Sequence, residues 1–391
     1  MTREPVVHPD FSALEATLHE RVADGTELGV SLCVIHDDEV LVDTWAGWAD
    51  RDRTVAWTAD TITPVWSISK VMTNLALLLL VDRGLVELDA PVARYWPEFA
   101  QGGKDAVTVA HLVSHSSGVP AWTPGFAAEQ LYDWDAAVAD LAAQEPWWEP
   151  GTASGYHLLN QGHLVGEVIR RVTGQLPGDV IRAEFGDVWD GGPGFHLGLP
   201  TEEWDHVSPV VAPRLPEVEP MAPDSVAWRA LTQPFVHVRT SDSPEWKSAQ
   251  IPGAGGFGHA RGVAEIQSIV SHGGTRSGRR FLAAETVEQI LTPRAEGVDL
   301  MLRVPVRFGA GWALPEPTMM PSAPAGRTCF WGGVGGSVVV NHLDSRTTVA
   351  YVMNRMIGEY APGTRALRPC GDSRSDEYLV LVWDALGVAH A

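Results

Sequence analysis

The amino-acid sequence predicts an α/β fold with an added α part: an antiparallel sheet flanked by helices, with a mainly helical domain inserted. Two observations predict it. Strand-like runs lie near both ends of the chain, whereas residues 85–250 are mostly helical patches separated by connections rich in Pro, Gly and Trp. Helical patterns also precede the first strands and follow the last ones, so they can cover the sheet. The predicted division is a discontinuous α/β domain, residues 1–100 and 255–391, and a helical domain, residues 101–254.

The N-terminal elements follow from apolar periodicity. Apolar residues recur at helical spacing through residues 10–24, which predicts an amphipathic helix closed by Gly25. Two β-type runs, 30–36 and 39–45, are joined by Asp37-Asp38, which indicates a hairpin. A second helix is expected from about Ser67 to Arg83, before Gly84.

The C-terminal part carries the remaining strands. A helix is expected from Gly262 and a short one over 285–291. Strand-like runs follow over 308–314, 337–341 and 347–354, and a last helix over 376–386. A sheet of about five strands or more, built from the two ends of the chain, is the simplest arrangement.

Composition limits the possible partners. The 391 residues carry a formal charge of −21, so nucleic acids and anionic membranes are not expected to bind, because both would be repelled. The longest apolar run, 75–81, is too short to cross a bilayer. Residues 1–10 lack a signal-peptide pattern, and Cys33, Cys329 and Cys370 form no disulfide framework or CxxC site. A cytoplasmic location is therefore expected.

A Ser-x-x-Lys motif begins the second predicted helix. Ser67 and Lys70 stand at i and i+3, so their side chains share one face and can meet. A serine needs a neighbour that takes its proton, and a buried lysine with a lowered pKa can do this. The motif by itself is weak evidence, because Ser67 could simply cap the helix.

Three further motifs follow in a fixed order. Residues 111–120 read His-Leu-Val-Ser-His-Ser-Ser-Gly-Val-Pro, residues 149–152 read Glu-Pro-Gly-Thr and lead to Tyr156, and residues 331–337 read Trp-Gly-Gly-Val-Gly-Gly-Ser. Together with Ser67 and Lys70, this order resembles the serine β-lactamase-like superfamily over nearly the whole chain. That superfamily includes class C β-lactamases, penicillin-binding carboxypeptidases and family VIII carboxylesterases.

The resemblance implies roles for particular residues. Ser67 would be the acylated nucleophile, Lys70 its proton acceptor or orienting partner, and Tyr156 the phenol that carries protons between the serine and the leaving group. The N–H groups of Ser67 and Val334 would form the oxyanion hole. This chemistry requires no metal and no cofactor.

Two departures from the β-lactamase pattern favour an esterase. The third position of the family's Tyr-x-Asn motif is Leu158, and Trp331 replaces the cation of the Lys-Thr-Gly motif. Trp331-Gly332-Gly333 and Tyr156-His157 resemble family VIII carboxylesterases more closely. Trp331, Gly332, Gly333, His157 and Leu158 are therefore the expected substrate-binding residues, although His157 could equally be a buried histidine that contacts only the backbone.

Several other motifs have weaker support. Residues 253–258 match G-x-G-x-x-G, but no apolar strand precedes them and no βαβ unit surrounds them, so a dinucleotide site is not expected. His111 and His115 have a metal-binding spacing without a third ligand, which favours buried histidines. The tryptophans of the helical insertion could belong to the core or to a wall of the cleft: Trp122, Trp134, Trp147, Trp148 and Trp228.

The sequence therefore predicts a carboxylesterase that acts on a small neutral short-chain or aryl ester through an acyl-enzyme at Ser67. A weak β-lactamase or D-amino-acid peptidase, an acyltransferase on the same core, and a non-enzymatic binding protein are the alternatives. Chain length of the acyl group, the alcohol, the stereochemistry and the oligomeric state are left open by the sequence.

Overall fold

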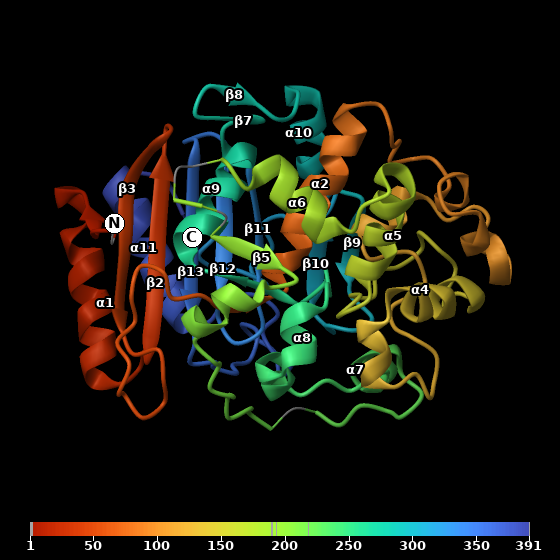
Figure 1. Cartoon of the computed structure of the whole chain (residues 1–391), viewed down its shortest axis with the longest axis horizontal. Coiled ribbons are helices and arrows are strands. Elements are labelled where there is room, and N and C mark those ends of the chain that lie inside the picture. The colour runs from red at the N-terminus through yellow and green to blue at the C-terminus, as the bar shows by residue number, and fades with distance from the viewer. Residues whose placement is uncertain (1–2, 189–190, 193, 218, 391) are drawn as a thin grey trace.

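The computed structural model describes residues 3–188, 191–192, 194–217 and 219–390 (Figure 1). Its main feature is a six-stranded antiparallel sheet with the strand order β1-β3-β2-β13-β12-β11. The strands come from the two ends of the described chain: β1 (Val6–Val7), β2 (Gly29–His36), β3 (Glu39–Gly47), β11 (Thr328–Gly332), β12 (Val338–His342) and β13 (Thr347–Met353). The two ends are joined through β2 and β13, where Leu32 lies opposite Tyr351.

Helices cover both faces of this sheet (Figure 1). The helix α9 (Ala260–Ser271) packs on β2, β12 and β13, while α1 (Ser12–Asp24) packs on β3 and against α11 (Ser373–Leu386) on the other face. Seven of the eight residues of β2 are buried, so the strand is apolar along its length instead of alternating. The hairpin between β2 and β3 turns at Asp37 and Asp38, whose φ angles are 51° and 67°; positive φ at both positions is what a two-residue type I′ turn requires.

The central helix is α2 (Ile68–Asp82), in which 13 of 15 residues are buried. It is buried on all sides because α5 (Gln161–Thr173) and α6 (Pro177–Phe185) pack on it from the middle of the chain, and β11 and α10 (Ala284–Leu291) from the sheet side. The N-terminus of α2 therefore lies where the helical part meets the sheet part.

The other described α-helices all lie in the middle of the chain. They are α3 (Val109–Val113), α4 (Trp134–Ala143), α7 (Val226–Thr232) and α8 (Pro244–Ser248). Short 3₁₀ helices occur throughout: Pro9–Phe11, Val92–Arg94, Pro97–Gly103, Ala128–Tyr132, Thr201–His206 and Val238–Asp242. The remaining strands form small ribbons, β7 (Thr275–Arg276) with β8 (Arg279–Arg280) and β9 (Ala295–Val298) with β10 (Pro305–Phe308).

A second sheet has three short strands in the order β4-β6-β5: β4 (Thr63–Trp66), β6 (Gly256–Gly258) and β5 (Phe195–Leu197). No sequence pattern predicts it, because strands of three or four residues with glycines carry almost no periodic signal. The sheet matters for the site because β4 leads directly into α2.

Two expectations about strands need correction. The strand predicted over 308–314 ends at Phe308, and the chain then turns, with the Gly309 N–H donating to the Trp312 carbonyl. Gly311 has φ of 96°, a conformation that favours glycine, and a Cβ at Gly309 would lie 1.8 Å from the Ile290 carbonyl oxygen. The sheet instead gains β11, which the predicted element list did not include.

The predicted fold class is confirmed: an antiparallel sheet made from both ends of the chain, with flanking helices and a helical part between them. The domain boundaries after residues 100 and 254 stay a prediction. Among the helices of the described residues, none is both long and apolar enough to cross a membrane.

Candidate active site

Ser67 lies at the junction between β4 and α2. It is the N-cap residue of α2 and its side chain caps no backbone N–H, so the hydroxyl remains available. Trp66 before it has φ of 51°, an uncommon conformation for a bulky side chain, which marks a strained turn at this junction. Ser67 is only 8% exposed and sits beside the positive end of the helix dipole. The turn therefore presents a hydroxyl at the start of the central helix.

Lys70 lies one turn further along α2 and is fully buried. Its Nζ atom is 3.1 Å from Ser67 Oγ and 2.7 Å from the carbonyl oxygens of Leu158 and Gly253. Burial lowers the pKa of Lys70 well below its ordinary value. The described residues place no carboxylate in an ion pair with it, so little opposes this shift toward the neutral amine.

The glycine-rich segment that matches G-x-G-x-x-G serves this lysine. Gly253 supplies one carbonyl, and a Cβ on it would lie 2.1 Å from the Leu159 carbonyl oxygen, so only glycine fits. The Gly256 N–H donates to the Ser69 hydroxyl at 2.8 Å, and a Cβ there would lie 2.6 Å from the same oxygen. The glycines therefore permit close packing against the first turn of α2, which accounts for the pattern without a dinucleotide.

Tyr156 approaches the same serine from the helical part. Its hydroxyl donates a hydrogen bond of 3.0 Å to Ser67 Oγ, and Lys70 Nζ lies 4.9 Å from the centre of its ring. Burial raises the pKa of Tyr156 above its ordinary value, although the hydrogen bond to Ser67 acts in the opposite direction. Burial therefore favours the protonated phenol. The structure brings Ser67, Lys70 and Tyr156 together as the sequence predicts.

A buried carboxylate that the sequence analysis missed fixes the position of Tyr156. Asp299 Oδ1 accepts the backbone N–H groups of Tyr156, Met301 and Leu302 at 3.0, 2.9 and 2.8 Å. The residue is fully buried, and burial raises the pKa of its carboxyl group. Asp299 stands in no motif and lies 143 positions from Tyr156, so no local sequence signal reveals it.

The expectation for the His157 side chain needs correction. The ring is fully buried; one nitrogen lies 2.6 Å from Ser117 Oγ and the other 2.6 Å from the Gly155 carbonyl oxygen. Burial lowers its pKa to about 3, so it stays neutral. The His157 backbone N–H donates to His115 Nδ1 at 3.1 Å. His157 therefore shapes the loop that carries Tyr156, and its side chain does not reach the cavity above Ser67.

Trp331 also lies behind the site instead of lining it. Its side chain is 2% exposed and stacks on His115, with ring centres 5.6 Å apart, while the Tyr156 ring lies 5.9 Å away. The neighbouring Gly332 is packed so closely that a Cβ would lie 2.8 Å from Cys370 Cα. Trp331 therefore packs among His115, Phe308 and Tyr156 and does not line the cavity above Ser67.

The segment after β11 reaches the start of α2. A Cβ on Gly333 would lie 2.4 Å from the Val65 carbonyl oxygen, so this glycine allows the two backbones to approach. The next residue, Val334, is 47% exposed and lines the same cavity as Ser67. In the described part of the chain neither the Ser67 N–H nor the Val334 N–H donates to a protein acceptor. These two N–H groups are the ones that the resemblance assigns to the oxyanion hole, and that role stays a prediction.

The cavity above Ser67 has a volume of about 330 Å³, within the range of small-molecule sites. Its described lining is apolar apart from Ser67 and His237 and contains no lysine or arginine. Of its lining residues, Leu158 is a predicted substrate-binding residue, and Ser67 and Val334 are the predicted donors of the oxyanion hole. The tryptophans of the predicted helical insertion lie outside this lining. The remaining lining residues were not predicted: Trp66, Leu159, Ala212, Pro213, Leu215, Leu231, Pro234, Phe235, Val236, His237, Val238, Ala254 and Leu367.

The described residues contain no group of three or more His, Cys, Asp or Glu side chains that could hold a metal ion, and the three cysteines are buried and free. The Ser67 hydroxyl contacts a buried amine and a buried phenol, and Ser67 lines an apolar cavity together with Val334. Such an arrangement can support covalent catalysis by a hydroxyl.

Comparison with known proteins gives a consistent result. The model of the family described as Beta-lactamase matches residues 14–369. The curated protein "Esterase/beta-lactamase LipL" of Mycobacterium tuberculosis is 32% identical over 344 residues, which cover 84% of this chain and 77% of that protein. A solved family VIII carboxylesterase is 31% identical, with a TM-score of 0.88, over 98% of this chain and 99% of that chain. A penicillin-binding protein homologue from Caulobacter crescentus is 33% identical, with a TM-score of 0.86, over 97% and 98% of the two chains.

Proposed function

The chain belongs to the beta-lactamase family and is a serine hydrolase with carboxylesterase activity, and we propose that Ser67, Lys70 and Tyr156 carry out this reaction on neutral esters. One observation carries the proposal: Ser67, which lines an apolar cavity, has its Oγ atom 3.1 Å from Lys70 Nζ and 3.0 Å from the Tyr156 hydroxyl.

The surroundings of Lys70 suit a general base. A neutral amine has two N–H donors and one lone pair. The carbonyl oxygens of Leu158 and Gly253, both at 2.7 Å, can take the two donors. The lone pair is then left for the Ser67 hydroxyl at 3.1 Å. Burial supports this neutral form, because it lowers the pKa of Lys70.

In the acylation step, Ser67 Oγ attacks the ester carbonyl carbon while its proton passes to Lys70 Nζ. The N–H groups of Ser67 and Val334 stabilise the negative charge on the carbonyl oxygen. The bond between the carbonyl carbon and the alcohol oxygen then breaks, and the proton returns from the Lys70 and Tyr156 pair to the alcohol. The product of this step is an ester of Ser67.

Deacylation repeats the same proton transfers with water. A water molecule attacks the acyl carbon and gives its proton to the Lys70 and Tyr156 pair. The bond to Ser67 Oγ breaks, the serine regains a proton, and the carboxylic acid leaves. The protonated Tyr156 hydroxyl, 3.0 Å from Ser67 Oγ, is placed to supply that proton.

The cavity favours a neutral substrate. Its described lining contains no lysine or arginine that could bind a carboxylate, whereas Leu158, Leu231 and Phe235 offer apolar surface. A missing charge-assisted contact lowers affinity by about 1.5–3 kcal/mol, a factor of roughly ten to one hundred. Short-chain and aryl esters should therefore react faster than β-lactams, which carry a carboxylate.

The test compares a p-nitrophenyl ester with a chromogenic cephalosporin on wild type, Ser67→Ala and the matched control Ser116→Ala. We expect kcat/KM for the ester to exceed that for the cephalosporin at least tenfold in wild type. Ser67→Ala should lose about a thousandfold or more in activity, and Ser116→Ala should keep it. A fluorophosphonate probe should label Ser67, as read by mass spectrometry. Labelling of Ser69 or Ser116, or faster turnover of the cephalosporin, would contradict the proposal.

A further inference from the structure

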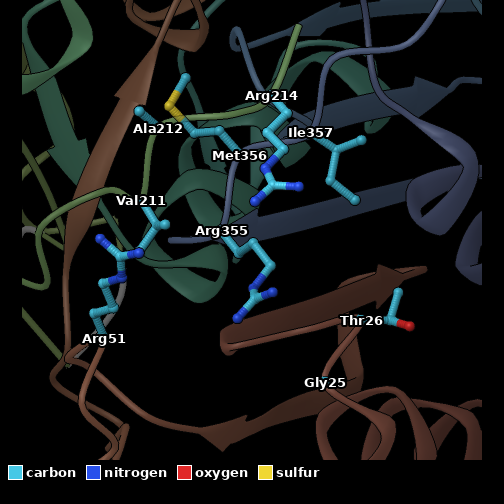
Figure 2. A pocket seen from close by; sticks show the side chains of 9 residues that line it. All are labelled: Gly25, Thr26, Arg51, Val211, Ala212, Arg214, Arg355, Met356 and Ile357. Atoms are coloured by element: carbon cyan, nitrogen blue, oxygen red, sulfur yellow. The ribbon is translucent and has the colours of Figure 1, made fainter. Parts of the chain in front are cut away.

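A second cavity, of about 490 Å³, shares the lining residue Ala212 with the first and has a different chemical character. Figure 2 shows the residues that line it. Three arginines from separate segments surround it: Arg51 from the loop after β3, Arg214 from the segment before α7, and Arg355 from the segment after β13. The other lining residues are Gly25, Thr26, Val211, Ala212, Met356 and Ile357.

None of the three arginines forms an ion pair within the described part of the chain. Arg355 is only partly exposed, and its Nε atom is buried without a hydrogen-bond partner. This is unusual here, because the chain has 49 acidic residues for 28 basic ones, and many of its arginines, such as Arg374, are ion-paired. The acidic residue Asp24 precedes the lining residue Gly25 in the chain. Its carboxylate accepts a hydrogen bond of 2.7 Å from the Thr26 N–H and forms an ion pair of 3.3 Å with Arg21.

The backbone that carries the arginines is held in place by main-chain hydrogen bonds. The Val211 N–H donates to the Asn354 carbonyl at 2.7 Å, and the Met356 N–H donates to the Val211 carbonyl at 3.0 Å. The Arg355 carbonyl in turn accepts a hydrogen bond of 2.9 Å from the Arg374 guanidinium. The segments of Arg214 and Arg355 are therefore fixed side by side before any ligand binds.

Three guanidinium groups around one hollow repel each other, and an anion between them would lower this repulsion. Solvent screens part of the repulsion, because Arg51 and Arg214 are exposed. Guanidinium is also the side-chain group best matched to oxyanions, because its planar N–H donors form paired hydrogen bonds with carboxylate and phosphate oxygens. The buried Arg355 Nε adds a donor that the protein itself does not satisfy, and a buried unsatisfied donor is costly.

We propose that the cavity between Arg51, Arg214 and Arg355 is a binding site for a small multivalent oxyanion, either phosphate or a dicarboxylate. The site is separate from the catalytic one: Ala212 lines both cavities, but no arginine lines the cavity above Ser67 within the described residues. The proposal does not depend on the role of Ser67, because it concerns binding alone.

The test is thermal unfolding of the full chain as a function of inorganic phosphate, with sodium chloride at the same ionic strength as the reference and succinate as a second ligand. A ligand that binds only the folded state raises Tm in a saturable manner. We expect such a rise with phosphate or succinate and none with chloride. A rise in Tm with phosphate points to phosphate as the ligand, and a rise in Tm with succinate points to a dicarboxylate.

Three variants make the test specific. Arg355→Gln and Arg214→Gln should weaken the apparent affinity at least tenfold, while Arg280→Gln, an exposed arginine on β8 outside the cavity, should bind like wild type. Ester hydrolysis by all three variants provides the check that they are folded. The proposal is overturned if wild type responds to neither anion beyond the chloride reference, or if the two cavity variants respond like wild type.

Discussion

The Tyr156 hydroxyl donates a hydrogen bond of 3.0 Å to Ser67 Oγ across 89 positions of sequence, and Lys70 Nζ approaches the same oxygen at 3.1 Å. Two proton-carrying groups thus converge on one atom. If they act as a unit, removing the second should cost little once the first is gone.

We therefore expect Lys70→Ala and Tyr156→Phe each to lower kcat about a hundredfold or more, and the double variant to lose far less than the product of the two. The measurement is kcat for one p-nitrophenyl ester on the four proteins of the cycle. Losses that multiply would indicate that Lys70 and Tyr156 act independently.

The pH dependence should report the ionisation of Lys70. Burial lowers its pKa well below the ordinary 10.5, and the neutral amine is the active base. The value of kcat/KM should therefore rise with pH through a single ionisation well below 10.5 and stay level above it. The Tyr156 phenol adds no second limb, because burial raises its pKa. A limb near 10.5 would show that Lys70 is not desolvated in the working enzyme.

The lowered pKa of Lys70 also makes the stability of the folded protein depend on pH. The unfolded chain binds the Lys70 proton more tightly than the folded chain does, so the contribution of this group to stability is present above pH 10.5 and is lost as the pH falls through the lowered folded-state pKa. Lys70→Met, which is neutral at every pH, should remove this dependence from urea unfolding curves.

Asp299 should act as a positioning residue for Tyr156. Its Oδ1 accepts three backbone N–H groups, and Asp299→Ala would leave them buried without partners, at a cost of about 1–3 kcal/mol each. We expect Asp299→Ala to lower kcat more than it changes KM, because the phenol shifts from Ser67. Asp299→Asn keeps an acceptor oxygen and should recover part of kcat.

Three measurements separate positioning from general instability: kcat, KM and Tm for Asp299→Ala and Asp299→Asn. A drop in Tm with kcat unchanged at a temperature where the variant is folded would assign Asp299 a structural role only.

The sequence predicted the large elements well because each has a local signal. Helix α2 is an apolar run that ends before Gly84, and the hairpin of β2 and β3 turns at two aspartates that tolerate positive φ. The three-stranded sheet of β4, β6 and β5 had no such signal. The run over 308–314 has the pattern of a strand, and the turn inside it has no local signal, because it depends on Gly309 and Gly311 packing against distant residues.

The contacts of the candidate site also fall into two groups, those that local spacing predicts and those that depend on distant segments. Ser67 and Lys70 are one helical turn apart, so the sequence by itself determined that their side chains meet. Tyr156 could be assigned through the order of motifs, but its contact with Ser67, like the placement of Asp299, depends on segments 89 and 143 positions apart in the chain.

The tertiary structure decided the rest. Only the tertiary structure shows that Trp331 and His157 are buried and that the carbonyls of Leu158 and Gly253 accept hydrogen bonds from Lys70. It also decides which residues line the two cavities. Local spacing determines which side chains share a helix face, because the helix geometry is fixed. The walls of a cavity come from loops whose relative positions depend on packing across the whole fold, and no periodicity in the sequence records that packing.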